Sequence, residues 1–379
     1  MRSLRLQFFC VFICLLFSIA SAWGEPRTPE TIQHPLTGYA FQFPRDHYAH
    51  NDYQVEWWYF TGNLQDAAGK EYGYQCSFFR VSLAGMKVLQ QYQKTPSQWD
   101  NGQIYFAHMT VADLDGKHFH FYERINRPGL GMAGAAADHL EVWNENWKLA
   151  GDAAARTLVA HEAQTGFDLQ LVPEKAPVVH GTGEDKPKWD LPEQAPNYYS
   201  LTRMKTTGTI TIDGRPVTVT GTSWMDHVFA ERLLVPEQTG WDWFSLKLDN
   251  DTEIMLLRLR MQDGNYDPRS GGTLVLSDGT AAHLPSEKYS VEVLEEWTSP
   301  KSGVTYPAAW RVTLPARNIT LKVVPDMAAQ ELFLLRSISN SYWEGSVTVE
   351  GEVEGRSVSG KGYVELVGYG GNLSGALGR

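Results

Sequence analysis

An internal repeat constrains the fold of this chain more than any other feature of its sequence. Four blocks recur in the same order, and the spacing between the two copies shrinks steadily along the chain. The pairs are 56–64 (EWWYFTGNL) with 240–248 (GWDWFSLKL), 110–116 with 273–279, 167–173 with 319–325, and 221–226 with 360–365. Self-similar blocks in a fixed order indicate duplication of one structural unit. We therefore predict two copies of one domain, over residues 40–228 and 236–370.

Each predicted domain consists of short strands. Residues 207–221 and 346–360 both alternate in polarity on either side of a central turn, which is a hairpin signal. Aromatic residues, which favour strands and the walls of cavities, make up 12% of the chain. Many short strands with tight turns are typical of antiparallel barrels and sandwiches, so we predict an all-β fold. Residues 137–149 are the exception, because they suit a helix capped by Asp138.

The N-terminus indicates export. Residues 1–22 have the pattern of a cleaved secretory signal, with two arginines, an apolar run over 6–19 and small residues before the cleavage point. The run is shorter than the ~18–20 residues that span a bilayer. Removal of the signal leaves Cys76 as the one cysteine, which we expect to be a buried thiol on a strand. A large exported chain without disulfides fits a bacterial protein that is periplasmic or secreted.

Charge and motifs argue against several classes of function. The formal net charge of −11 is opposite in sign to the surface that a nucleic acid requires, so we expect no nucleic-acid partner. A serine nucleophile is not predicted, because Ser223 is followed by Trp224 and lies outside a G-x-S-x-G motif. Nothing in the sequence predicts a cofactor, and we expect none.

Five motifs resemble those of one family. They are EWWYFTG at 56–62, YYSLTR at 198–203, GTSWMDH at 221–227, GWDWF at 240–244 and GYVE at 362–365. Together they resemble the AttH-type lipocalin-like proteins, the predicted secreted hydrolase group, which is related to the carotenoid 1,2-hydratases. The resemblance spans about residues 40–370 and implies two tandem lipocalin-like antiparallel β-barrels, in agreement with the repeat. Many members of this group have no assigned reaction.

Asp226 is the leading candidate for a catalytic residue. On a strand it shares a face with Trp224, while Met225 and His227 share the other. A carboxyl group among aromatic rings is desolvated, so its pKa should rise, and the neutral acid could protonate an alkene beside indole rings that stabilise a cation. The resemblance implies the same proton donor, since carotenoid hydratases have Tyr-x-Asp-His here, with Trp224 replacing the tyrosine. The alternative is a structural carboxyl, as its repeat partner Glu365 suggests.

Glu56 is the second candidate acid. It shares a strand face with Trp58, and Trp57 lies on the opposite face. One interpretation pairs Glu56 with Arg203 where the barrel closes, and another places it in the same cavity as Asp226, as half of an acid–base pair. The alternative is a core aromatic cluster that includes these tryptophans.

The predicted site residues fall into two groups. The candidate catalytic residues are Asp226, Glu56 and His227. The candidate ligand-binding residues are Trp224, Trp57, Trp58, Tyr199, Arg203, Trp241, Trp243 and Tyr363. We predict no metal site, because the histidines at 108, 118 and 120 have no third ligand fixed by spacing, and those at 47 and 50 suit hydrogen bonding.

Three functions remain open. The first is an exported carrier of a hydrophobic small molecule such as a lipid or isoprenoid, since aromatic-lined barrels enclose such ligands. The second is a hydratase or isomerase acting on an isoprenoid-like substrate, with Asp226 as general acid. The third, suggested by the AttH-type resemblance, is an accessory protein of a membrane transport system. We expect a monomer with an apolar ligand, and any contact with a membrane or transporter to be transient.

Overall fold

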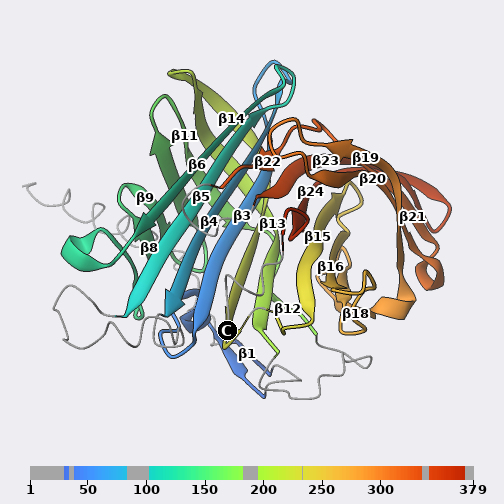
Figure 1. Ribbon diagram of the computed structural model, residues 1–379, viewed down its shortest axis with the longest axis horizontal. Helices are drawn as coiled ribbons and strands as arrows, with labels where there is room; N and C mark the ends of the chain where they lie inside the picture. The colour runs from blue at the N-terminus through green and yellow to red at the C-terminus, as the bar shows by residue number, and fades with distance from the viewer. Residues whose placement is uncertain are drawn as a thin grey trace, which may run out of the picture.

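The computed structural model describes residues 30–33, 38–82, 102–181, 195–232, 234–334 and 341–371. Their regular structure is β apart from short 3-10 turns, which confirms the predicted all-β class (Figure 1). Within these residues, no helix has the length and apolar character needed to cross a membrane. The predicted signal, residues 1–22, lies outside the described residues, so export remains a prediction.

The strands form one small sheet and two large ones. The small sheet pairs β1 (Glu30–Gln33) with β2 (Ala40–Phe43). The first large sheet contains β3 (Val55–Gln65), β4 (Glu71–Ser82), β5 (Gln103–Asp113), β6 (His118–Asn126), β7 (Ala133–Ala135), β8 (Leu140–Asn144), β9 (Trp147–Gly151), β10 (Arg156–Glu162), β11 (Thr165–Pro173), β12 (Val178–Val179), β13 (Asn197–Ile212) and β14 (Arg215–Ala230). The second contains β15 (Gln238–Leu248), β16 (Glu253–Met261), β17 (Gly271–Val275), β18 (Ala281–Pro285), β19 (Ser290–Thr298), β20 (Thr305–Leu314), β21 (Ile319–Pro325), β22 (Glu331–Leu332), β23 (Tyr342–Val353) and β24 (Arg356–Val367).

The two large sheets have the same antiparallel strand order. The first runs β6-β5-β4-β3-β14-β13-β11-β10-β9-β8-β7, with β12 on β13, and the second runs β18-β17-β16-β15-β24-β23-β21-β20-β19, with β22 on β23. Their registers also match, because Asp226 lies opposite Tyr59 in one sheet and Glu365 lies opposite Trp243 in the other. The duplicated architecture is therefore confirmed, whereas the domain boundaries remain predictions.

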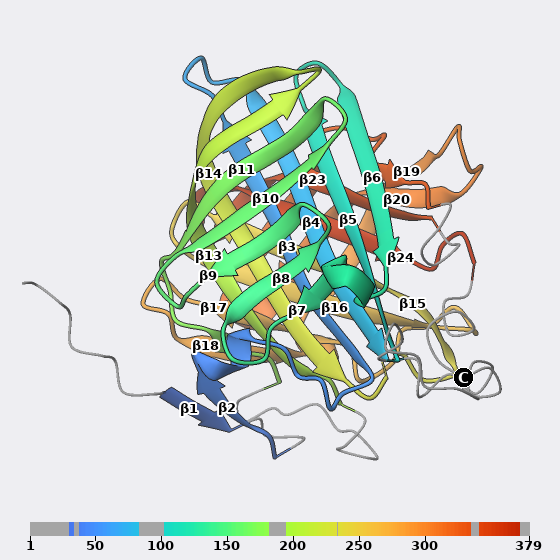
Figure 2. The ribbon, with the colours of Figure 1, turned by 90° about the vertical axis from the view of Figure 1, so that its left-hand side faces the viewer.

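The two sheets differ in how far they close. The first curls into a nearly closed barrel, and the second remains an open half-barrel (Figures 1 and 2). One bridge across the edges of the first barrel runs from the Arg124 guanidinium to the Asn144 carbonyl (3.0 Å). Trp58, Trp147 and the free thiol Cys76 have no exposed surface within its core. Side chains thus form a packed core inside the first barrel.

The predicted helix over residues 137–149 is wrong. The segment forms β8 and β9, a hairpin that turns at Glu145 with a φ of 58°. Leu140 and Val142 in β8 are buried while their neighbours are more exposed, which is the period of two of a strand. The apolar spacing also suits a helix, but strand pairing prevails because this hairpin extends the barrel wall beside β10.

The two large sheets pack face to face through their outer surfaces. Strand β3 contacts β24, β13 contacts β15, and β4 contacts β23. The side chains of both sheets form one cluster: Tyr59, Tyr198, Trp224, Val228, Trp243, Met255 and Tyr363. The rings of Tyr59 and Trp243 meet edge-on with centroids 5.1 Å apart. The sheets approach closely at Gly73, where a Cβ atom would collide with the hydroxyl group of Tyr363.

We predict that Gly73→Ala destabilises the protein by about 1–3 kcal/mol, because the added methyl group overpacks this contact. Urea unfolding would measure the loss. Tyr363→Phe removes the colliding oxygen, so the double variant Gly73→Ala/Tyr363→Phe should recover most of the stability. Equal losses in the single and double variants would contradict a contact between these two residues.

Candidate functional site

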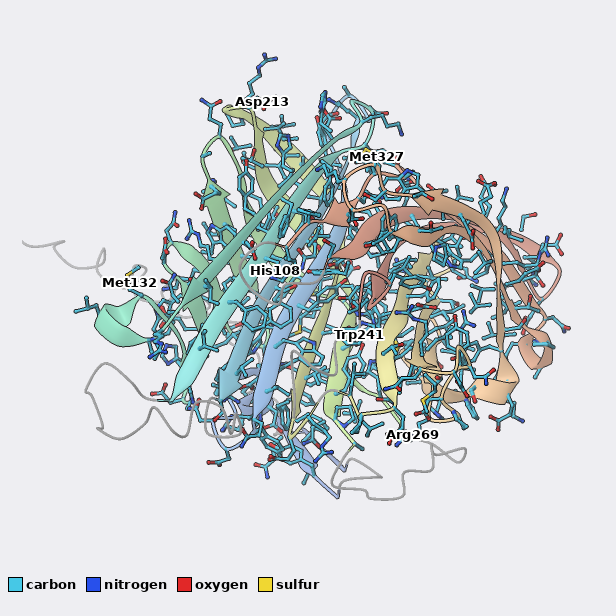
Figure 3. The ribbon with its side chains drawn as sticks, viewed as in Figure 1. His108, Met132, Asp213, Trp241, Arg269 and Met327 are labelled. Carbon is cyan, nitrogen blue, oxygen red and sulfur yellow. The ribbon has the colours of Figure 1, made fainter. Side chains whose placement is uncertain are left out.

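A cavity of about 150 Å³ lies between the two large sheets, and we call it the interdomain pocket. Strands β3, β4, β5, β13 and β14 line it from one side, and β15, β16, β23 and β24 from the other. Its wall is largely apolar: Val55, Trp57, Phe79, Phe106, Val228, Trp241, Trp243 and Leu257. Figure 3 labels three of its residues, His108 from the first sheet, Trp241 from the second, and Arg269. Two tryptophans with partly exposed rings, Trp57 and Trp241, leave apolar surface open to a ligand.

The Asp226 carboxyl group faces the interdomain pocket and is only 4% exposed. Its Oδ1 accepts hydrogen bonds from the Trp224 indole (2.6 Å) and the Ser200 hydroxyl, and its Oδ2 accepts one from the Tyr198 hydroxyl (2.6 Å). Burial raises the pKa of Asp226 to about 7, although the three hydrogen bonds oppose this shift. Near neutral pH the group therefore exists in both protonation states, as a general acid requires.

A second carboxyl group, that of Glu365, lines the same pocket. The Trp241 indole donates a 2.7 Å hydrogen bond to its Oε2. Burial raises the pKa of Glu365 to about 7, and the negative charge of Asp226 adds to the shift. The repeat places Glu365 and Asp226 at equivalent positions, which is also compatible with the structural role weighed for both. Their shared cavity instead gives the pocket two acids.

Two neighbours of these acids limit the proton chemistry. Burial lowers the pKa of His108 to about 4, so its imidazole is neutral near pH 7, and its Nδ1 lies 2.8 Å from the Tyr342 hydroxyl. Glu344 lies opposite Glu365 on the adjacent strand and accepts a hydrogen bond from the Tyr59 hydroxyl. Burial and the charge of Glu365 raise the pKa of Glu344 well above its ordinary value. Asp226 and Glu365 are therefore the pocket groups best placed to exchange protons at neutral pH.

Glu56 lies on the other side of the sheet, inside the first barrel. Its side chain has no exposed surface and forms an ion pair with Arg80 (3.1 Å). Arg203 pairs with Glu253 instead (2.5 Å), so the predicted Glu56–Arg203 pair is wrong. Although Glu56 also borders the interdomain pocket, its carboxylate is held by His227 and Arg80 on the barrel side. The Asp226 carboxylate is held by Tyr198, Ser200 and Trp224, so the two carboxylates have no hydrogen-bond partner in common.

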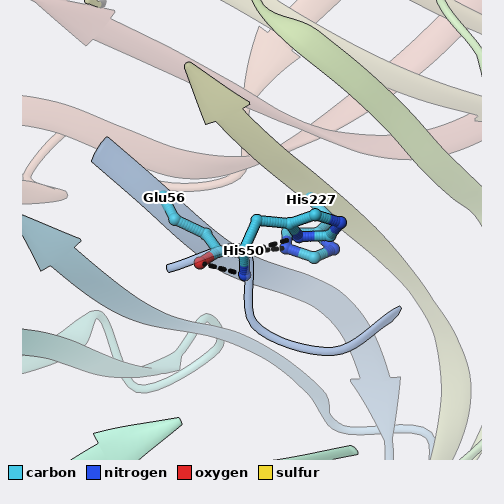
Figure 4. A group of neighbouring side chains, drawn as sticks. All are labelled: His50, Glu56 and His227. Atoms are coloured by element: carbon cyan, nitrogen blue, oxygen red, sulfur yellow. Dashed lines mark hydrogen bonds and ion pairs between the residues drawn. The ribbon is translucent and has the colours of Figure 1, made fainter. Parts of the chain in front are cut away.

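A buried polar cluster surrounds Glu56, as Figure 4 shows. Its Oε1 lies 2.8 Å from His50 Nδ1 and 2.9 Å from His227 Nε2. Burial favours a neutral Glu56, but hydrogen bonds from His227 and His50 prevail and lower its pKa below the ordinary value. Burial also disfavours a charged His50, yet its bonds to Asp46 and Glu56 raise its pKa. The cluster therefore favours the charged carboxylate of Glu56 and, at His50, stabilises the charged form of the imidazole.

The same three side chains could in principle hold a metal ion. Their ligand atoms lie within 4.8 Å of one another, and two histidines with a carboxylate are a common ligand set for zinc or iron. A metal would have to break both His–Glu hydrogen bonds and sit beside the positive charge of Arg80. The arrangement therefore suits a hydrogen-bonded network better than a metal ion.

The structure divides the predicted site residues into three groups. Trp57, Trp241 and Trp243 line the interdomain pocket with Asp226, and Trp224 and Tyr363 pack beside it. Trp58, Tyr199, Glu56 and His227 lie inside the first barrel. Arg203 is remote, beside Glu253. Tyr198 and Ser200 were not predicted as partners of Asp226, although both belong to the YYSLTR motif at 198–203.

Comparison with known proteins gives a family and two similar solved structures. The model of a family described as AttH-like matches residues 34–369. A putative AttH from Nitrosomonas europaea is 28% identical, with a TM-score of 0.77 over 89% of this chain and 99% of that one. Kievitone hydratase from Nectria haematococca is 16% identical, with a TM-score of 0.63 over 82% of this chain and 88% of that one, and shows a shared fold. No curated protein sequence matches the chain.

We predict that Asp226 makes stability depend on pH. The folded state holds the proton up to about pH 7, whereas the unfolded chain loses it near 3.8, the ordinary pKa of an aspartate. Between these values the folded state binds more protons, so stability falls as pH rises, by on the order of 4 kcal/mol, and is flat above pH 7. Asp226→Asn should remove this part of the slope in urea unfolding at pH 5 and pH 8. The control Asp213→Asn, at an exposed turn, should keep it; identical slopes in the wild type and Asp226→Asn would contradict the buried acid.

Proposed function

Because this chain belongs to the AttH-like family, we propose that its interdomain pocket binds a hydrophobic small molecule and that Asp226 transfers a proton to it. The observation that carries this proposal is a buried carboxyl group with a pKa of about 7 in an apolar cavity. Such a carboxyl group can be neutral when the ligand arrives and charged after it has reacted.

The shape of the pocket indicates the class of ligand. A volume of about 150 Å³ holds a group of roughly the size of benzene, and because the cavity is partly open, a longer molecule would extend out of it. The indoles of Trp57, Trp241 and Trp243 offer flat apolar surfaces and few hydrogen-bond donors. An isoprenoid or another unsaturated lipid-like molecule suits this wall best.

A hydratase reaction follows from the positions of the two acids. The neutral Asp226 gives its proton to one carbon of an alkene and becomes a carboxylate, and the other carbon becomes a cation that aromatic rings stabilise. Water then bonds to that carbon and loses a proton to Glu365 or Asp226, so the net change is addition of water. Loss of a neighbouring C–H proton instead of water addition would give an isomerase. Kievitone hydratase is named for a hydration reaction and shares this fold, which supports the proposal.

A carrier without turnover is the second candidate. One observation favours it, because both oxygens of Asp226 already accept hydrogen bonds from donors of the protein. The proposal extends to export by way of the signal over residues 1–22, which suits a carrier or an accessory protein of a transport system.

We expect Leu257→Trp to weaken binding of retinol, an apolar isoprenoid, at least tenfold. Leu257 lines the pocket and is partly exposed, so a larger ring would occupy the space of the ligand. The fluorescence of bound retinol would give the dissociation constants. Leu276→Trp is the control, since Leu276 is exposed on the second sheet outside this pocket. Equal affinity in Leu257→Trp and the wild type would place the ligand elsewhere.

For catalysis, we expect the wild type to add deuterium to an acyclic isoprenoid alkene, such as geraniol, in heavy water. Asp226→Asn should abolish this incorporation, because the amide cannot donate the proton, while retinol still binds. Glu365→Gln should lower the rate of hydration at least tenfold but retain part of the deuterium incorporation. Mass spectrometry would measure both the deuterated alkene and the hydrated product. Binding without deuterium incorporation by the wild type would make the protein a carrier.

A further inference from the structure

Arg156 is a buried charge without a partner inside the first barrel. It opens strand β10 on the same face as Leu158 and Ala160, both of which belong to the core of that barrel. The side chain is 0% exposed, and its Nε, Nη1 and Nη2 atoms have no hydrogen-bond partner among the described residues. A guanidinium group stays protonated at physiological pH, so this is a positive charge removed from water.

A second arginine in the same barrel shows how this fold compensates such a charge. Arg80 is also 0% exposed, but its Nε meets the Glu56 carboxylate at 3.1 Å. Its Nη2 donates to the carbonyl groups of His50 (2.8 Å) and Tyr53 (3.0 Å). A buried charge with no partner costs several kcal/mol, whereas a paired and hydrogen-bonded one is tolerated. Arg156 therefore lacks a counter-charge that Arg80 has.

Among the residues that the structure describes, no carboxylate forms a hydrogen bond with Arg156. Asp152 is the carboxylate whose charge acts on Arg156, but it is exposed and accepts hydrogen bonds from the backbone of Ala154 (2.7 Å) and Ala155 (3.0 Å). The other groups that interact electrostatically with Arg156 are His47 and Tyr199, which are joined by a 2.7 Å hydrogen bond. Burial and the positive charge of Arg156 lower the pKa of His47, so this imidazole is neutral.

We propose that the first barrel binds a small monovalent anion, a halide or a small carboxylate, at Arg156 beside His47 and Tyr199. The anion supplies the missing counter-charge, and the guanidinium group offers it several N–H donors. Because side chains fill the rest of this barrel, the site excludes long ligands. It is separate from the interdomain pocket, which lies outside the barrel, so it does not depend on the proposed function.

Thermal unfolding in different sodium salts at equal ionic strength tests this site. Gluconate is the reference anion, because it is too large to enter the barrel. Replacing it by chloride or bromide up to 100 mM should raise the melting temperature of the wild type by about 2–4 °C in a saturable way, since binding stabilises the folded state. A rise with acetate as well would show that the site takes carboxylates, and a rise with acetate alone would restrict it to them.

Two variants separate binding at Arg156 from general salt effects. Arg156→Met keeps the length of the side chain and removes its charge, so the saturable rise should disappear. Arg311→Met is the control, because Arg311 forms an exposed ion pair with Glu292 on the second sheet, and it should respond to salt as the wild type does. A rise that persists in Arg156→Met, or a wild type that is insensitive to all of these anions, would overturn the proposal.

A direct measurement on the wild type tests whether an anion binds at Arg156, even if Arg156→Met fails to fold. Crystals of the full chain soaked in sodium bromide should show an anomalous peak within about 3.5 Å of the Arg156 guanidinium group. Ordered water in its place, with no bromide, would show that solvent alone compensates the charge and would overturn the anion site.

Discussion

The packing of two outer sheet surfaces against each other is the interaction on which the other features depend. It removes Tyr59, Trp224 and Tyr363 from water and leaves a cavity where the aromatic packing is incomplete. The same desolvation gives Asp226 and Glu365 their raised pKa values, since neither is neutralised by a nearby cation. The interface thus produces both the cavity and the raised pKa values beside it, so any change in how the two sheets dock would alter the two together.

One strand of the first barrel separates two kinds of polar chemistry. Asp226 and His227 are adjacent in sequence, yet Asp226 faces the interdomain pocket and His227 faces the barrel interior, where it meets Glu56 at 2.9 Å. Outside the barrel the acids lack counter-charges and their pKa values rise. Inside it, Glu56 has Arg80 and two imidazoles, and its pKa falls. Because side chains alternate across a strand, His227 can join a charged network on one side while its neighbour Asp226 has a raised pKa on the other.

The sequence was sufficient to predict the duplication, the all-β class and the shared face of Trp224 and Asp226, because repeats and a period of two are visible in one dimension. It could not place Glu56, since that requires the register between β3 and β14, and a slip of one residue would reverse the answer. It also could not distinguish a strand from a helix over residues 137–149, where neighbouring strands decide the outcome. Tyr198 and Ser200 were missed as site residues because their contact with Asp226 crosses between strands.

The two halves meet through equivalent residues. Tyr59 contacts Trp243, and Lys247 donates a 3.1 Å hydrogen bond to Asn63, and in both pairs the partners occupy matching positions of the repeat. Contacts between like positions are the mark of a twofold symmetric homodimer. The two halves of this chain are therefore arranged as the subunits of such a dimer would be, and each contributes one acid to the interdomain pocket. In the present chain the two matching acids differ, one an aspartate and the other a glutamate, so the interdomain pocket is asymmetric although the contacts around it are paired.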